Sequence, residues 1–303
     1  MKVAFIINAR NKAKYVAQSV MGALSQTYPC EVILSDQGST DGTYDIMQAV
    51  VDAYMAHTER KHTVKLLRCP VEGPYGMRAA NANFDWAWRQ SSPDCEYIFQ
   101  SSADDYSLPN RVEACVKKMD EGARPTAIAT TMFFAKPGDT EPKSVSGYPQ
   151  ESGYVKAGEG LSNLAYGSCI AAYRRDFLDK VSDQAGANTP DVLFGYLAAL
   201  MDGFYVVAEP HHVHNEVADT DNCGYQGKLR GASGDLSLQL AECNHAQLLR
   251  LYKTCAEQAA VLTNNQVPTE DWNPLIQAMV SQACAWIDAR DKLSEQNISP
   301  IPL

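Results

Sequence analysis

Residues 3–43 read VAFIINARNKAKYVAQSVMGALSQTYPCEVILSDQGSTDGT and give the first indication of the fold. This stretch opens with a short apolar run of the kind that forms a buried strand, and residues 15–26 then carry apolar side chains at helical spacing. A second apolar run over residues 30–35 ends in a cluster of turn-forming residues. Three residues of this turn are suited to cap the helix that follows: Ser39, Thr40 and Asp41.

The same alternation continues towards the middle of the chain. Strands are predicted at residues 64–69 and 95–100, and helices at residues 44–56 and 78–90. Strands that alternate with helices of about 10 to 15 residues indicate βαβ units, and therefore an α/β domain with a mainly parallel sheet and flanking helices. The later expectations are a helix at 109–121, a strand at 125–135, a loop at 136–160, a strand and helix within 168–181, a helix at 188–203 and a strand at 204–210.

The composition and charge indicate a soluble protein with no general nucleic-acid affinity. The formal net charge of -10 and the pI near 5.1 disfavour polyanions as partners. No apolar stretch has the roughly 20 residues needed for a transmembrane segment, and the opening residues turn polar too soon for a signal peptide, so a cytoplasmic location is expected.

We predict two parts in the chain. Residues 1–227 form the α/β domain, and residues 228–303 form a C-terminal helical extension with helical periodicity and no predicted strands. Acceptor binding, oligomerisation and coverage of the sheet are the alternatives for this extension. Three polar segments, NARN, SDQGSTDG and SSADDY, each follow a predicted strand. In a parallel sheet they lie at one edge, where ligands bind.

Residues 1–216 resemble the family 2 glycosyltransferases of the GT-A fold. The shared order is a strand, an Asn-containing loop, a helix, the motif SQTYP, a strand and Asp-x-Gly-Ser-Thr-Asp-Gly. The resemblance implies an enzyme that transfers a sugar from a nucleotide-diphosphate sugar, and UDP is the expected carrier. Gln37 stands where many members carry a second acidic residue, which leaves the nucleotide open. In the family the first two loops hold the donor, which implies donor contacts from Asn8, Ala9, Arg10, Asp36 and Gln37.

The segment GPYGMRAANANFDWAW resembles a family segment that lies beside the donor. The resemblance places Arg78 and Asn83 near the donor phosphates or sugar. A solvated cation at a helix start is the alternative for Arg78.

The segment SSADDY falls at the family's Asp-x-Asp motif, which implies a divalent cation, Mn²⁺ or Mg²⁺, between carboxylate and diphosphate. Ser102 occupies the first acidic position of the commonest form, and some members instead have a small residue followed by two aspartates. On that pattern Asp105 is the metal ligand and Asp104 contacts the donor. A surface turn is the alternative for both.

Two downstream features also match the family. Asp191 falls at the catalytic base of inverting members, with Pro190 in place of the usual Glu, and a first-turn aspartate that favours the helix dipole is the alternative. In the segment HHVHN, His214 is the expected contact to the metal or diphosphate, with His212 second.

Two other functions compete with sugar transfer. A non-catalytic relative that binds a nucleotide sugar is one, and Ser102 and Pro190 favour it. A sugar nucleotidyltransferase needs a Gly-rich phosphate loop after the first strand, and NARNKAKY has no Gly. A saccharide or glycolipid head group is the default acceptor, while a protein, a small molecule or modified DNA stays open.

Overall fold

The computed structural model describes residues 1–70, 77–136, 141–144, 151–155, 171–180, 194, 198 and 203–215, with only the backbone for 77–81 and 144. Strands and helices alternate over most of these ranges. Their bounds are β1 (Val3–Ala9), α1 (Val16–Leu24), β2 (Glu31–Asp36), α2 (Thr43–Ala56), β3 (Thr63–Arg68), α3 (Met77–Trp88), β4 (Tyr97–Ser102), β5 (Tyr106–Ser107), α4 (Arg111–Asp120), β6 (Ala127–Ala135), β7 (Lys143–Ser144), β8 (Gly153–Val155), β9 (Ala171–Arg174), α7 (Arg175–Lys180) and β10 (Phe204–Asn215).

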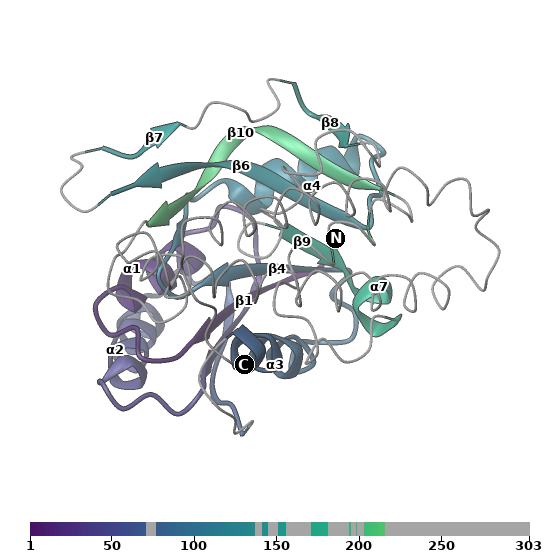
Figure 1. Ribbon diagram of the computed structural model, residues 1–303. Coiled ribbons are helices and arrows are strands. Elements are labelled where there is room, and N and C mark those ends of the chain that lie inside the picture. Colours follow the sequence, from purple (N-terminus) through teal and green to yellow (C-terminus); the bar gives the residue numbers. More distant parts are fainter. Residues whose placement is uncertain are drawn as a thin grey trace, which may run out of the picture.

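One mixed sheet organises the described part of the chain. The strand order is β3-β2-β1-β4-β9-β6-β10-β5, with β7 paired to β6 and β8 paired to β10. The four strands β3, β2, β1 and β4 are parallel, β9 runs antiparallel to both of its neighbours, and β6 and β10 are again parallel. Figure 1 shows α1 and α2 beside the first half of this sheet and α4 beside β6 and β10.

The strand β1 is buried on both faces, as a central strand of a parallel sheet should be. Phe5 and Ile7 join an apolar cluster with side chains of α1, α2 and α4. Side chains alternate along a strand, so the neighbouring Ser35 of β2 points to the other face, where Asn83 of α3 contacts it. Helices therefore cover both faces, which confirms the predicted α/β fold with a mainly parallel sheet.

Three details differ from the expectations. The segment 136–160 was expected to be a loop, but it contains β7 and β8, because pairing with β6 and β10 satisfies the backbone groups of these short segments. The motif HHVHN does not follow the last strand; it is the end of β10, with a register shift on each side of Pro210.

In the ranges given above, no helix combines the length and apolar character needed to cross a bilayer.

The third difference concerns the start of α2. Its N-cap is Gly42 at φ 90°, and the Asp41 carboxylate accepts from the Thr43 N–H at 3.0 Å. Ser39 and Thr40 do not cap this helix. They bind the loop after β1 instead, as the site description below explains.

Candidate active site

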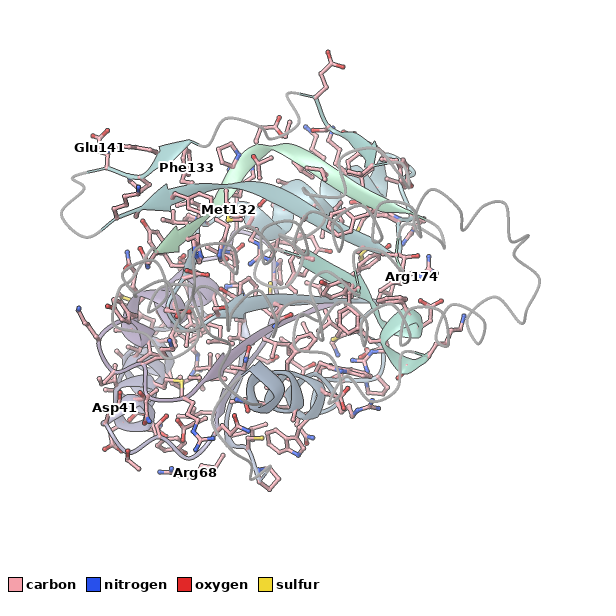
Figure 2. The ribbon with its side chains drawn as sticks, in the orientation of Figure 1. Asp41, Arg68, Met132, Phe133, Glu141 and Arg174 are labelled. Carbon is pink, nitrogen blue, oxygen red and sulfur yellow. The ribbon has the colours of Figure 1, made fainter. Side chains whose placement is uncertain are left out.

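The carboxyl ends of β1, β2 and β4 meet at one edge of the sheet. The strand register places Asn8 opposite both Ser35 and Ser102, and Ala9 opposite Asp36. The three polar segments that follow these strands therefore lie together, as the parallel arrangement predicts. Figure 2 shows Asp41 and Arg68 at the lower left of the molecule.

The first two loops are fastened to each other by hydrogen bonds. The N–H of Gln37 donates to the Ala9 carbonyl at 2.9 Å. The N–H of Asn11 donates to Ser39 Oγ at 2.9 Å, and its Oδ1 accepts from the Thr40 N–H at 2.9 Å. Asn11 has φ 50°, a left-handed conformation that Asn tolerates better than most residues. These bonds fix the backbone of both predicted donor-binding loops.

The Asp36 carboxylate is fully buried at the base of these loops. Its Oδ2 accepts from the Ser39 N–H at 3.2 Å and lies 3.7 Å from Arg68 Nη1. Its Oδ1 has no hydrogen-bond partner among the described residues. The Arg68 guanidinium stacks at 3.7 Å on the Tyr44 ring. A buried acceptor beside an exposed, stacked cation suits a ligand that carries an N–H or hydroxyl group.

Asn83 is buried and contacts β2. Its Oδ1 accepts a short hydrogen bond from Ser35 Oγ, and its Nδ2 donates to the Ser35 carbonyl at 3.4 Å. Asn83 thus joins α3 to β2, and its contact to a donor stays a prediction. The side chain of Arg78 and the whole of Asp191 lie outside the described residues, so their predicted roles stay predictions.

The two adjacent aspartates after β4 are buried, with exposed fractions of 7% for Asp104 and 2% for Asp105. Asp104 Oδ2 accepts from Lys12 Nζ at 2.7 Å, and both side chains are shielded from solvent. Burial raises the pKa of Asp104, the Asp105 charge raises it further, and the Lys12 ammonium opposes both. Sequence reasoning missed Lys12, because its contact with Asp104, 92 positions away, depends on the path of the loop after β1.

Asp105 contacts the end of β10. Both of its carboxylate oxygens lie 3.1 Å from His214 Nδ1, and Oδ1 accepts from the Asn215 N–H at 2.9 Å. Asn215 Nδ2 also donates to the Asp104 carbonyl at 2.6 Å. Burial alone would raise the pKa of Asp105, but the neighbouring histidines outweigh burial and hold it below its usual range. The predicted partners Asp105 and His214 are therefore brought together.

His212 is the second histidine on this face of β10 and is completely buried. Its Nε2 lies 3.7 Å from Asp105 Oδ2, and its Nδ1 lies 3.2 Å from Ser107 Oγ. Burial lowers the pKa of His212 to about 4, so the ring is neutral near pH 7. Sequence reasoning placed His212 second to His214 and did not foresee its contact with Ser107.

Asp105 and His214 are two candidate ligands for a divalent cation, which would take its other ligands from a bound molecule. Within the described ranges, no three His, Cys, Asp or Glu side chains form a group that could hold a metal ion. An ionised carboxylate accepts only, so His214 Nδ1 donates to Asp105 in this structure. Mg²⁺ and Mn²⁺ are typically held by one or two carboxylates together with phosphate oxygens of a bound molecule.

A family comparison identifies the class of enzyme. The model described as glycosyl transferase family 2 matches residues 4–182, more than half of the chain. The chain belongs to glycosyl transferase family 2. It is therefore a glycosyltransferase, and the sequence-based recognition of this family is confirmed.

Solved structures support the GT-A fold of this family 2 member. S. aureus TarS 1-349 in complex with UDP matches with a TM-score of 0.56 at 18% identity, over 97% of this chain and 86% of that chain. A mannosyltransferase from Pyrobaculum calidifontis, in complex with GDP-Man and Mn²⁺, matches with a TM-score of 0.51 at 14% identity, over 97% and 84%.

A longer structure of S. aureus TarS matches with a TM-score of 0.56 at 16% identity, over 87% of this chain. This chain spans only 42% of the length of that TarS chain. No curated protein sequence is significantly similar to the chain.

Proposed function

We propose that the protein transfers a sugar from a UDP-sugar to an acceptor hydroxyl with inversion, in a metal-dependent reaction. The observation that carries this proposal is the pair of buried aspartates at the carboxyl end of β4, in contact with Lys12 and His214 and beside the loops after β1 and β2. A saccharide or glycolipid head group is the proposed acceptor.

The proposed donor contacts divide between the loops. Asp36 has a buried oxygen to accept from the base or ribose, and Gln37 stands next to it. Asn8 and Ala9 at the end of β1, and Arg10 directly after it, are the proposed donor contacts from the neighbouring strand. Asp104 contacts the ribose or phosphate, and Arg78 and Asn83 are the proposed contacts from α3.

Asp105 and His214 are the proposed protein ligands of Mn²⁺ or Mg²⁺. When bound, the cation neutralises the charge that develops on the departing diphosphate. Two hydrogen bonds orient the Asp105 carboxylate in this structure. The Asn215 N–H donates to one of its oxygens, and His214 Nδ1 donates to the other. Asp191 is the proposed base that takes the proton of the acceptor hydroxyl.

Calorimetric titration of UDP into the protein with Mn²⁺ and with EDTA tests this proposal. We expect binding with Mn²⁺ and a loss of at least about 10-fold in affinity with EDTA or in Asp105→Ala. Asp94→Ala is the matched control, because this exposed aspartate pairs with Lys2 away from the site. Equal UDP affinity in all four samples would contradict the metal role, and absence of binding to UDP, GDP, CDP and dTDP would contradict sugar transfer from these donors.

A further inference from the structure

Helix α2 carries a second row of mainly apolar residues besides the row that faces the core. The core row consists of the buried residues Thr43, Met47 and Val51. A helix that covers a sheet needs only one such row. The second row also has helical spacing and consists of Ile46, Ala49, Val50, Ala53, Tyr54 and His57. All six are half-buried or exposed, so contact with the core does not account for this row.

The second row forms one wall of a groove between α1 and α2, which we call the α1–α2 groove. Met21, Leu24 and Ser25 of α1 form the other wall, and the groove has a volume of about 560 Å³. Figure 1 shows the two helices next to each other at the left side of the molecule. Met21 is 53% exposed at this groove. An exposed methionine in an apolar groove is typical of a surface that binds another protein surface.

The α1–α2 groove carries no formal charge, although the protein as a whole is strongly acidic. The net charge is -10, and 20% of the residues are charged. Among the described residues that line the groove, none is Asp, Glu, Lys or Arg. A charged peptide would therefore find no ion-pair partner inside the groove, whereas the apolar face of a helix would bury its surface there.

The second row of α2 supplies such a face and is complementary to itself. Its central residues are separated by four, three and four positions, which is the spacing of paired helices, and they are Ile46, Val50, Ala53 and His57. This spacing is the same in both directions. In an antiparallel pair of α2 helices, Ile46 of one copy therefore lies opposite His57 of the other. Val50 lies opposite the smaller Ala53.

We propose that the α1–α2 groove binds α2 of a second copy of this chain, in a two-fold symmetric dimer whose α2 helices are antiparallel. Both copies use the same surface, as in other isologous dimers, and the two-fold axis passes between Val50 and Ala53. Met21 of each copy packs beside the α2 helix of the other. The interface is small, so the fraction of dimer depends on protein concentration. The dimer is independent of the proposed sugar transfer.

Sedimentation equilibrium of the full chain over about a 100-fold range of concentration tests the dimer. Ala53→Arg should raise the dissociation constant at least about 10-fold, because it brings two like charges together near the axis. Met55→Arg is the matched control, since this exposed residue lies two positions away on another face of α2. A wild type that is monomeric at every concentration, or equal dissociation constants for all three proteins, would overturn the proposal.

A mixture of two variants tests the antiparallel arrangement. Ala53→Glu should weaken the dimer as Ala53→Arg does, because like charges again meet near the axis. An equal mixture of the two variants should associate at least about 10-fold more tightly than either alone, since opposite charges then meet. Misfolded variants could not recover in this way. A mixture that associates no more tightly than its components would overturn the two-fold arrangement.

Discussion

The ion pair between Lys12 and Asp104 leads to a prediction at the scale of single residues. Lys12→Met should lower the free energy of unfolding by about 3 to 5 kcal/mol, because it leaves the Asp104 carboxylate buried without its cation. Adding Asp104→Asn should recover part of the loss, since the remaining group is neutral. Denaturant unfolding monitored by circular dichroism measures both effects.

The exposed pair of Lys2 and Asp94 provides the matched control for this measurement. Its atoms lie 2.8 Å apart, almost as close as the buried pair, but solvent reaches both side chains. Lys2→Met should therefore leave the unfolding midpoint unchanged. An equal loss in both lysine variants would show that burial does not determine the effect.

Glu31 leads to a prediction about pH. Burial alone would raise the pKa of Glu31, but Lys65 Nζ at 2.7 Å and the Ser92 N–H outweigh burial and lower it to about 2. A depressed pKa in the folded state stabilises the protein above the ordinary value near 4.5, and this stability is lost as pH falls from there towards 2. The loss should be about 3 kcal/mol.

Glu31→Gln should flatten this part of the pH profile. The comparison is the free energy of unfolding of the variant and the wild type at intervals between pH 5 and about pH 2.5. Parallel profiles for the two proteins would contradict the assigned role of Glu31.

Sequence reasoning at the residue scale found the acidic groups but not their partners. Asp36, Asp104 and Asp105 follow strands, so the fold class alone places them at one edge of the sheet. The contact of Asp104 with Lys12 depends on how the loop after β1 folds back, and no spacing rule gives that path.

At the scale of elements, Gly22 marks the close approach of α1 to β5. A Cβ at this position would lie 2.8 Å from the Ser107 carbonyl oxygen and 3.0 Å from its nitrogen. Gly22→Ala should destabilise the protein by about 1 to 3 kcal/mol, because backbone of β5 must move. The higher helix propensity of Ala offsets only about 1 kcal/mol. Thermal unfolding measures the difference.

Gly153 of β8 is the control for this substitution, since a Cβ there meets nothing within 4 Å and its φ is not positive. Gly153→Ala should leave the melting temperature unchanged or slightly raised. A Gly22→Ala variant as stable as Gly153→Ala would show that α1 and β5 separate without cost.

The elements with a clear apolar period were predicted closely, while the very short strands were missed. Predicted strands at residues 30–35 and 64–69 correspond to β2 and β3 within one residue at each end. The two-residue strands β5 and β7 are too short to show a period. They exist because β10 and β6 offer backbone partners, which is information from the tertiary structure.

At the scale of the whole molecule, the division at residue 227 stays a prediction. All strands of the described sheet lie before residue 216, as does the region matched by the family model. A chain that ends at residue 227 should therefore keep the UDP affinity and the melting temperature of the full chain. Calorimetry and scanning fluorimetry on both chains measure this, and aggregation or loss of UDP binding in the shorter chain would show that residues 228–303 complete the domain.

The contact between Asn215 and Asp105 has a consequence for protein synthesis. The two residues are 110 positions apart in the chain, and β10 supplies His214 and the Asn215 N–H to the loop that carries Asp104 and Asp105. Chains emerge from the ribosome in order, so a nascent chain that extends only through β6 already has every carboxylate of the loop but lacks these partners. Donor binding should therefore begin only after β10 has left the exit tunnel, and a chain stalled before that point should be unable to hold the nucleotide.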